Sequence, residues 1–499
     1  MNLRHCLSTA AFFAASVPAF AAQFPSDIQQ ANILHCFDWK FTDIQAELPR
    51  IAAAGFGAVQ VSPVQGNCGD GAEWFYAYLP YDFKMRDDKA NGNGTRAQLS
   101  ALCAEADKYG IKIIVDVVSN HVNPSTLYRD AWWGQGGRER NEGAVNYNSR
   151  YSITHGNLGQ YKDVNSELPE VQQRIKDFLI DLRSLGVKGI RWDAAKHIGL
   201  PSEGCDFWKA VKEVDGLWHY GEILDNPGTS ADTEWKVMRE YTQYMSVTDV
   251  AFGSNALNML KQGKMPVYHA NLALTKAEYG QDFPGQYLVY WGESHDTYAN
   301  DGGNTKNVDQ KYIDRAYMLG ACRLKETAVY FSRPSEKVNN RIRMGRKGSS
   351  EALESKAIGA VNNFRANMAG IDEKTVHKYG ATGYFVNARL DAGVLILLPT
   401  AGERDIEVQN PGCYAPQGTF TDAVGGGTFT VTADIIKGHV GPEGVAVLYK
   451  DGFQGVDEIA IPDESKAPVF YDLAGRRVAN PERGLYIKVQ DGRSTKVML

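Results

Sequence analysis

Apolar segments of strand length alternate with amphipathic segments from residue 33 to about residue 335. A short, continuous apolar run is typical of a strand buried on both faces, whereas apolar residues three or four positions apart predict a helix. By these criteria the chain contains eight strands, at 33–37, 57–62, 111–118, 187–193, 219–223, 247–252, 287–292 and 328–331.

Helix signals lie between these runs. Thr42 with Gln45, and Thr95 with Gln98, have the spacing of a capping box, so each pair predicts the start of a helix. Repeated strand–helix units over this length favour an α/β fold, a (β/α)8 TIM barrel over residues 22–375. A doubly wound open sheet is the alternative, but it usually carries a glycine-rich phosphate loop after its first strand, and none follows Phe37.

Two stretches depart from the barrel pattern. Residues 122–164, after the third strand, show no strand–helix alternation and are rich in Gly, Asn, Arg and Trp, and so predict a small inserted domain. From residue 376 the apolar runs become short and alternating, at 383–390, 393–399, 427–432 and 445–449, with Gly and Pro between them. This pattern predicts a C-terminal antiparallel β-sandwich over 376–451. Residues 452–499 form a separate tail with further strands at 469–472, 484–489 and 494–499.

The N-terminus has the features of a signal peptide over residues 1–21. A short polar region with Arg4 and His5 precedes an apolar run at 6–17 and a small-residue cleavage site that ends at Ala21. The run is shorter than the roughly 20 residues that a membrane span needs. We therefore expect a secreted protein, extracellular or on the cell surface or in a periplasm, with no transmembrane segment.

Six cysteines remain after residue 21, and no two have the spacing of a zinc or redox motif. We expect mostly buried thiols, with Cys68 and Cys205, both in loops, as the candidates for a disulfide. The chain has 53 basic and 59 acidic side chains, a formal net charge of −6. This balance argues against nucleic acid as a partner, because binding phosphates needs a basic face. We expect a monomer.

Acidic residues stand at the ends of several predicted strands. Asp116 lies in the third strand, Asp193 ends the fourth, Glu222 lies near the end of the fifth, and Asp296 follows the seventh. In an α/β barrel the C-terminal strand ends form the active site. Burying carboxylates together is costly unless they have a chemical task or a cation.

Glycoside hydrolysis is one such task, because it needs a nucleophile or base and a proton donor, both carboxylic. Neighbouring strands lie about 4.8 Å apart, and retaining glycosidases hold their two carboxyl groups about 5–5.5 Å apart. Asp193 and Glu222, on adjacent strands, could meet this spacing. The alternative is a metal-dependent barrel hydrolase, but its several histidine ligands are not found here in a metal-ligand spacing.

Four segments resemble the conserved blocks of the α-amylase family: 116–121, 189–197, 220–224 and 291–296. Segments 35–39 and 58–63 resemble the first two barrel strands of animal-type members. The resemblance covers about 30–335 and implies retaining endo-hydrolysis of α-1,4 bonds in starch-like glucans. The alternatives are another α-glucan-active member (maltooligosaccharide-forming, transglycosylating or debranching) and a non-catalytic glucan-binding protein. Segments 470–478 and 484–487 resemble C-terminal sorting tails of secreted Bacteroidetes proteins; a plain accessory β-domain is the alternative.

The resemblance implies a role for each matching residue. Asp193 would be the nucleophile, Glu222 the acid/base, and Asp296 the residue that holds sugar hydroxyls, while Arg191 would orient Asp193. Other substrate contacts would come from Tyr78, Trp74, Phe75, His121, His295, Lys196 and His197. Trp74 and Phe75 have the alternative of simply packing their loop.

The resemblance also implies two ions. A structural calcium ion (Ca2+) would be bound by Asn120, by Asp163 and by the carbonyl of His197, ligands of the hard oxygen type that calcium prefers. The alternative for Asp163 is to cap the following helix. A chloride ion would be bound by Arg191, Arg333 and Ser294, where Ser294 replaces an expected Asn. The alternative is that Arg333 pairs with a carboxylate.

Overall fold

The computed structural model describes residues 24–66, 72–85, 92–125, 127, 129–224, 231–266, 284–300, 302–335 and 341–450, and strand residues within 469–498. The predicted signal peptide, 1–21, and Cys68 lie outside the described residues. The chain divides into two compact units, one over Ala22–Gly455 and one that contains Val456–Leu499. No helix in the described ranges is both long enough and apolar enough to cross a membrane.

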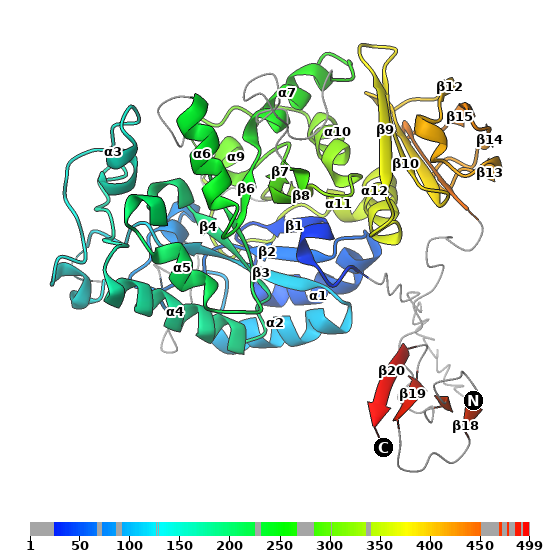
Figure 1. Cartoon of the computed structure of the whole chain (residues 1–499). Coiled ribbons are helices and arrows are strands. Elements are labelled where there is room, and N and C mark those ends of the chain that lie inside the picture. The colour runs from blue at the N-terminus through cyan, green and yellow to red at the C-terminus, as the bar shows by residue number, and fades with distance from the viewer. Residues whose placement is uncertain are drawn as a thin grey trace, which may run out of the picture. The chain divides into compact units, whose positions relative to one another are not determined.

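The first unit is built on a closed barrel of eight parallel strands (Figure 1), and the predicted TIM-barrel fold is confirmed. The strands are β1 (Ile33–Cys36), β2 (Ala58–Val61), β3 (Lys112–Val118), β4 (Gly189–Asp193), β5 (Trp218–Gly221), β6 (Ser246–Thr248), β7 (Leu288–Tyr290) and β8 (Thr327–Phe331). β1 pairs with both β2 and β8, which closes the barrel.

Alternation along each strand separates two cores. Ile33 packs with Ala58, Ile114 and Val329 in a cluster formed mainly by residues of the barrel strands. Leu34, the next residue, belongs to the large cluster that the strands share with the surrounding helices. This two-sided burial explains why most residues of the barrel strands are apolar.

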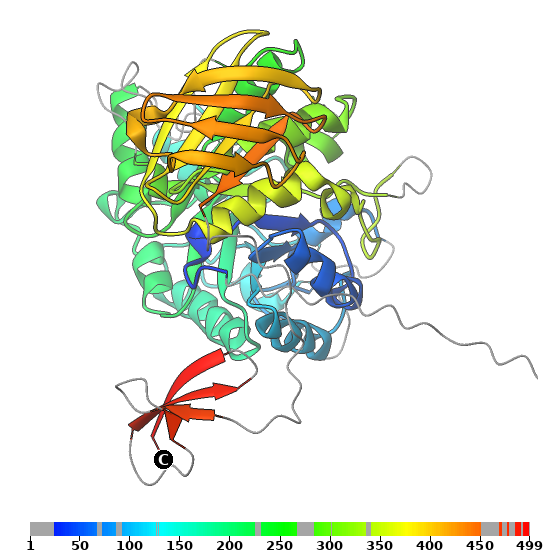
Figure 2. The ribbon, with the colours of Figure 1, turned by 90° about the vertical axis from the view of Figure 1, so that its right-hand side faces the viewer.

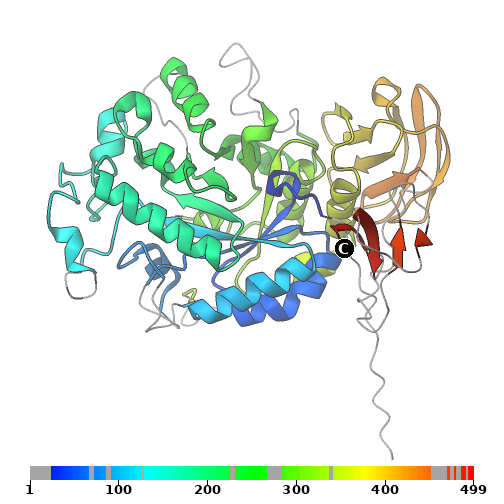
Figure 3. The ribbon, with the colours of Figure 1, turned by 60° about the horizontal axis from the view of Figure 1, so that its bottom comes forward.

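Helices cover the outside of the barrel. Those between β1 and β8 are α1 (Phe41–Ala53), α2 (Arg96–Lys108), α3 (Arg150–His155), α4 (Pro169–Ser184), α5 (Phe207–Lys212), α6 (Ala231–Tyr241), α7 (Val250–Leu260), α9 (His295–Ala299) and α10 (Gln310–Ala321). α11 (Glu351–Glu354) and α12 (Lys356–Asn367) follow β8. α1, α2 and α4 run side by side along one flank (Figures 1 and 3).

Local signals predicted some helix ends correctly and others wrongly. Thr95 caps α2 in a capping box with Gln98, as expected. The box predicted at Thr42 is wrong, because α1 begins at Phe41 and its N-cap, Lys40, makes no side-chain cap. The strand predicted at 247–252 is also too long. β6 ends at Thr248, and the Asp249 side chain caps α7, which takes up the following apolar residues.

The segment 122–164 contains a single turn of 3-10 helix (Ala131–Gly134), the short helix α3 and irregular backbone. Trp133 anchors it, fully buried, with its Nε1 donating to Asp82 Oδ1 over 3.2 Å. Arg174 of α4 donates to both Asp82 and Asp130, so the segment is tied to the barrel by a partly buried ionic network.

Two four-stranded antiparallel sheets follow the barrel and pack face to face (Figure 2). One contains β9 (Glu373–Lys378), β10 (Tyr384–Arg389), β11 (Gly393–Leu397) and β16 (Val445–Tyr449). The other contains β12 (Arg404–Gln409), β13 (Gly418–Thr421), β14 (Thr428–Val431) and β15 (Ile435–Val440). Sequence analysis missed β9, β12, β13 and β15, and β9 begins before the predicted boundary at 376. The strand β9 is mostly polar and β12 alternates on one buried face only, so neither forms a continuous apolar run.

The second unit contains a four-stranded sheet in the order β18–β17–β19–β20. Its strands are β17 (Val469–Tyr471), β18 (Arg477–Val478), β19 (Leu485–Gln490) and β20 (Arg493–Met498). Cysteines in the described residues are free: four are buried and Cys413 is exposed. Of the two disulfide candidates, Cys205 is a free, buried thiol whose Sγ lies 3.4 Å from the Ser166 hydroxyl, and Cys68 lies outside the described residues.

Candidate active site

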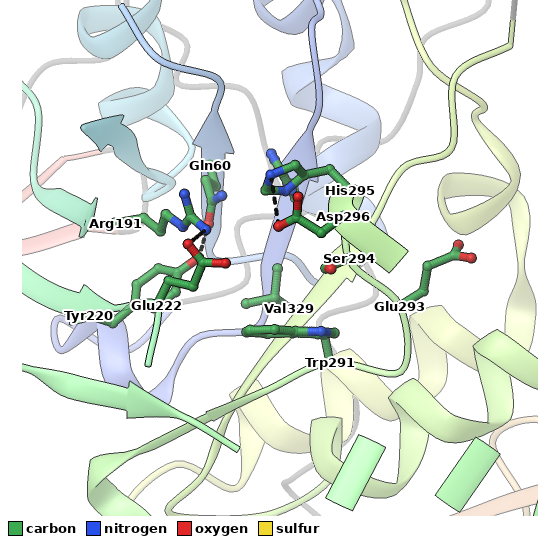
Figure 4. Close-up of a pocket in the computed structure, with 11 residues that line it drawn as sticks. Gln60, Arg191, Tyr220, Glu222, Trp291, Glu293, Ser294, His295, Asp296 and Val329 are labelled. Atoms are coloured by element: carbon green, nitrogen blue, oxygen red, sulfur yellow. Dashed lines mark hydrogen bonds and ion pairs between the residues drawn. The ribbon is translucent and has the colours of Figure 1, made fainter. Parts of the chain in front are cut away.

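Four carboxylates gather around one arginine at the C-terminal end of the barrel. Arg191 Nη1 lies 2.9 Å from Asp116 Oδ1 and 2.9 Å from Asp193 Oδ1. Arg191 Nη2 lies 2.9 Å from Glu222 Oε2 (Figure 4). Asp296 enters the same group from α9, since its carboxyl contacts Glu222.

Strand register places these side chains together. Arg191 and Asp193 are two positions apart on β4, so they point to the same face. Asp116 of β3 lies opposite Arg191 in the parallel register. Glu222 directly follows β5, and its backbone N–H donates to the Trp192 carbonyl over 2.9 Å. Ala194 N–H donates to Glu222 Oε2, also over 2.9 Å, and fixes that carboxyl.

Burial and mutual repulsion both raise the pKa values of the acids. Burial raises the pKa of Asp116 to about 6, and Arg191 opposes this shift. Burial also raises the pKa of Asp193 well above its usual value; Arg191 opposes the rise and Glu222 adds to it. Without Arg191, burial and repulsion between the carboxylates would both favour their protonated forms. This cation therefore allows several ionised carboxylates in one buried site.

Asp296 lies in a polar cradle. Its Oδ1 accepts a hydrogen bond from Asn300 over 3.1 Å, and its Oδ2 lies 3.3 Å from His295 Nε2. Burial raises the pKa of Asp296, while a hydrogen bond with Glu222 lowers it. Two carboxyl groups can share a hydrogen bond only when one carries a proton. Burial lowers the pKa of His295 to about 3, so this ring is neutral and can donate to a ligand or to Asp296.

The predicted aromatic residues lie beside the carboxylates. Tyr78 donates its hydroxyl to Asp116 Oδ2 over 3.0 Å, and its ring stacks on His295 with centroids 5.0 Å apart. Trp74 packs against His295 and Phe37, so much of its ring serves to pack the loop, which was the alternative to substrate contact. Phe75 is 37% exposed and is the more open of the two.

The other predicted substrate contacts come from two places. His121, directly after β3, lies with Nε2 2.9 Å from the Tyr78 carbonyl and stacks on Tyr161 at 5.1 Å. Lys196 and His197 form a 3-10 turn after β4. Lys196 Nζ donates to the Leu224 carbonyl over 2.9 Å.

Sequence reasoning missed Tyr147, which comes from the inserted segment. Its ring is 48% exposed and lies 5.1 Å from Lys196 Nζ and 5.9 Å from the His197 ring. It also missed the part played by Asp116 as a partner of Arg191. The position of Asp116 within the predicted third strand was a signal, but its contact with Arg191 depends on the register of β3 against β4. Nothing local to residue 147 indicates where its loop goes.

The three predicted calcium ligands converge. One terminal atom of the Asn120 amide lies 3.2 Å from the His197 carbonyl oxygen and 3.2 Å from Asp163 Oδ1. If that atom is the amide oxygen, three oxygens face one another, an arrangement that a hard cation stabilises; if it is the nitrogen, it donates to both. With the amide oxygen turned inward, the residues fit calcium. Asp163 also accepts from Arg140 over 2.7 Å, and α4 has Leu168 at its N-cap, so Asp163 does not cap that helix.

The three predicted chloride ligands do not converge. Arg333 donates two hydrogen bonds to Glu293, Nε to Oε2 over 2.7 Å and Nη2 to Oε1 over 2.8 Å. The Ser294 hydroxyl caps α9 by accepting from Thr297 N–H. Arg191 faces the carboxylates. The described residues do not fit the expected anion site, and the alternative of an Arg333–carboxylate pair describes the geometry.

No family model matches the chain. It is 29% identical over 476 residues to an α-amylase of Butyrivibrio fibrisolvens, a match that covers 84% of this chain and 47% of that protein. It is 27% identical over 484 residues to an α-amylase of Clostridium acetobutylicum, covering 89% and 57%. The chain thus spans about half the length of these curated relatives.

Solved structures share the fold. Wild-type α-amylase I of Eisenia fetida superposes with a TM-score of 0.66 at 17% identity, covering 86% of this chain and 99% of that one. An α-amylase of Malbranchea cinnamomea also gives 0.66, at 16% identity, and covers 88% and 100%. At such identities the superpositions establish the barrel with its added β-domain, and nothing about substrate.

Proposed function

We propose that this chain, a member of the α-amylase family of glycoside hydrolases, cleaves internal α-1,4-glucosidic bonds of starch and related glucans with retention of configuration. The observation that carries the proposal is the pair of contacts, each 2.9 Å, from one guanidinium to Asp193 and to Glu222. Two carboxyl groups that meet the same guanidinium can adopt the separation of about 5–5.5 Å used by retaining enzymes. A glutamate-to-glutamine variant of α-amylase I of Eisenia fetida, which shares the fold, forms a complex with maltohexaose, a glucan chain.

In the first half of the reaction Asp193 attacks the anomeric carbon as the carboxylate, and Glu222 donates its proton to the glycosidic oxygen. The bond between that carbon and the leaving oxygen breaks, and an ester forms with Asp193 Oδ. Arg191 favours the ionised form of Asp193, against the effect of burial. Asp296, which interacts with Glu222, lies beside the proton donor.

In the second half Glu222, now ionised, takes a proton from water, and the oxygen of that water attacks the anomeric carbon. The ester to Asp193 breaks and Asp193 leaves as a carboxylate. The proton taken from water has restored Glu222 to its acid form. Two inversions at one carbon give net retention.

Asp296 and His295 would hold the sugar hydroxyls during both steps. The neutral His295 ring offers a donor and Asp296 an acceptor, which suits vicinal hydroxyls. Hydrogen bonds that strengthen as the ring flattens toward the oxocarbenium-like state lower the barrier. Tyr78 and Phe75 would line the sugar that becomes the ester, while Tyr147, Lys196 and His197 would lie on the leaving-group side.

Calcium is proposed as a structural ion at Asn120, Asp163 and the His197 carbonyl. When bound, it would neutralise the converging oxygens and tie the inserted segment to β3. Among the described residues no group of three or more His, Cys, Asp or Glu side chains could hold a metal ion. The proposed set has one carboxylate and otherwise neutral oxygens, a composition that calcium accepts.

We further propose that the protein is exported after removal of residues 1–21 and acts as a monomer on a soluble or granular glucan. The tail, 452–499, would serve as a sorting or accessory β-domain. These statements rest on the N-terminal sequence, the charge balance and the tail motif.

The deciding experiment compares viscosity loss with release of reducing ends on soluble starch. Endo-hydrolysis predicts a rapid fall in viscosity before many reducing ends appear, and NMR of the first products should show the α-anomer. Release of a single short maltooligosaccharide without viscosity loss would favour an exo-acting relative, and binding without any cleavage would favour a glucan-binding protein.

A further inference from the structure

Arg333 and Glu293 form a closed ion pair next to the active site. Arg333 comes shortly after β8, and Glu293 shortly after β7, the neighbouring strand. The Glu293 side chain is 0% exposed, and both its oxygens accept from the same guanidinium. Such a two-fold contact is the strongest geometry available to an arginine and a carboxylate.

Two backbone carbonyls and an aromatic ring also contact the Arg333 guanidinium. Its Nη2 donates to the carbonyls of Thr305 and Val308 over 3.1 and 2.9 Å. The Tyr298 ring lies over the guanidinium at 5.0 Å. A further anion would have to displace Glu293 from a site that already satisfies the charge.

Arg191, the second arginine of the expected anion site, already contacts carboxylates as well. A small cavity, about 20 Å³, lies beneath the catalytic group and is lined by Arg191, Glu222, Asp296, Trp291 and Ser294, among others. Arg333 is not part of this lining, and the Glu293 side chain is directed away from Glu222 and Asp296 (Figure 4). The volume suits a single water molecule, and size alone does not exclude a halide.

The charge of the cavity lining does exclude a halide. Arg191 already contacts Asp116, Asp193 and Glu222, so its single positive charge faces three acids. Another anion here would be repelled by those of the three that are ionised, in a medium of low dielectric constant.

We infer that Glu293 is a built-in anion for Arg333, and that this enzyme needs no exchangeable chloride. Glu293 is thus a positioning residue. It links the ends of β7 and β8 and so holds the turn that carries His295 and Asp296, two and three residues further along. The inference rests on the proposed glucan hydrolysis for its kinetic readout, but its binding readout does not depend on it.

The first test uses the full-length mature chain in halide-free buffer. Sodium chloride replaces sodium gluconate at a constant ionic strength of about 0.1 M, so that screening does not change. We expect kcat/KM on soluble starch to change by less than about twofold, which corresponds to roughly 0.4 kcal/mol. The melting temperature should also be the same in both salts. A wild-type protein that is activated or specifically stabilised by chloride would overturn the inference.

The second test removes the built-in charge without changing shape. Glu293→Gln leaves a buried guanidinium without its anion, so kcat/KM in gluconate should fall by about tenfold or more. Chloride should then restore activity and raise the melting temperature, which a purely structural role of Glu293 would not produce. The double variant Glu293→Gln, Arg333→Gln has neither charge and should ignore chloride.

The outcomes separate this inference from the proposed function. A folded Glu293→Gln variant that is indifferent to chloride refutes the built-in anion. Should that variant not fold, the wild-type comparison of salts still decides whether chloride binds. Should the wild type fail to cleave starch in any salt, the proposed function fails, and the melting temperatures in chloride and gluconate decide the inference alone.

Discussion

Arg191 Nη1 and Asp193 Oδ1 lie 2.9 Å apart, two positions from one another on a single strand. Because β4 alternates its side chains, the nucleophile and the cation that permits its charge are placed by one element. The same guanidinium reaches Glu222 on the next strand. The charge balance of the site therefore depends on one arginine.

Asp193→Asn should abolish hydrolysis while leaving the fold intact. An amide cannot form the ester, so kcat should drop by about 10⁴-fold or more, as for other lost nucleophiles. The measurement is reducing-end release with circular dichroism on the same sample. Asp405→Asn is the matched control, because Asp405 is an exposed aspartate on the sandwich. Retention of a tenth of wild-type activity in Asp193→Asn would rule out this assignment.

Glu222→Gln should slow cleavage in a way that depends on the leaving group. Loss of a general acid costs about 10²–10⁴-fold when the leaving oxygen needs a proton. A maltosyl fluoride needs little protonation, so its first step should be affected far less than that of starch. Stopped-flow fluoride release compared with starch hydrolysis measures the difference. Equal losses on both substrates would mean that Glu222 does not act as the acid.

Arg191→Gln should destabilise the protein, and the effect should depend on pH. Three buried carboxylates would lose their cation, at a cost of about 3–5 kcal/mol at pH 7. Burial already raises the pKa of Asp116 to about 6, and losing Arg191 raises it further. A folded-state pKa above the unfolded value means that the native state binds more protons, so the free energy of unfolding rises as pH falls through that pKa.

Urea unfolding of Arg191→Gln and wild type at pH 7 and pH 5 measures this effect. The difference in the free energy of unfolding between the two proteins should be smaller at pH 5, where protonation of Asp116 and Asp193 relieves the repulsion. In the remaining activity of the variant, the acidic limb should move to higher pH, since Asp193 must be ionised to attack. A gap that widens on acidification would contradict this account.

Removal of calcium should lower the melting temperature. A ligand present at a hundred times its Kd contributes about 2.7 kcal/mol to the folded state, and a chelator removes this. Adding calcium chloride back should restore the transition, and magnesium chloride should restore less of it. The melting temperature of Asn120→Ala should neither fall with the chelator nor rise when calcium is added back. If wild-type protein melts identically with and without chelator, the proposed calcium site is wrong.

Tyr147→Ala should weaken substrate binding on the leaving-group side. Aromatic contacts contribute about 0.5–1.5 kcal/mol, so kcat/KM on maltooligosaccharides should fall by roughly 2–10-fold. Tyr147→Phe should keep most of the activity, because the ring face is retained. Tyr151→Ala is the control, since Tyr151 is an exposed tyrosine of the same segment and stacks on His155 instead. Equal effects of the two alanine variants would point to the segment's stability rather than to substrate contact.

The barrel could be predicted because its signals are local. A strand buried on both faces must be apolar, as in β3 and β8, and parallel strands must end on the same face. That second fact alone brought Asp193, Glu222 and Asp296 together before any coordinates. Where the local signal was weak, prediction failed. Residues after Thr248 are apolar in either a strand or a helix, and only the Asp249 cap and the packing of α7 decide between them.

The contacts of charged groups were decided by tertiary structure. The sequence determined that Arg191, Arg333, Glu293 and Asp116 follow or lie within barrel strands. It did not determine that Glu293 would bind Arg333, or that Arg191 would contact Asp116, because each choice depends on strand register and side-chain reach. Tyr147 depends on the path of an irregular segment, which follows from buried anchors such as Trp133. Electrostatic pairing needs distances to within about an ångström, and a one-dimensional pattern does not contain them.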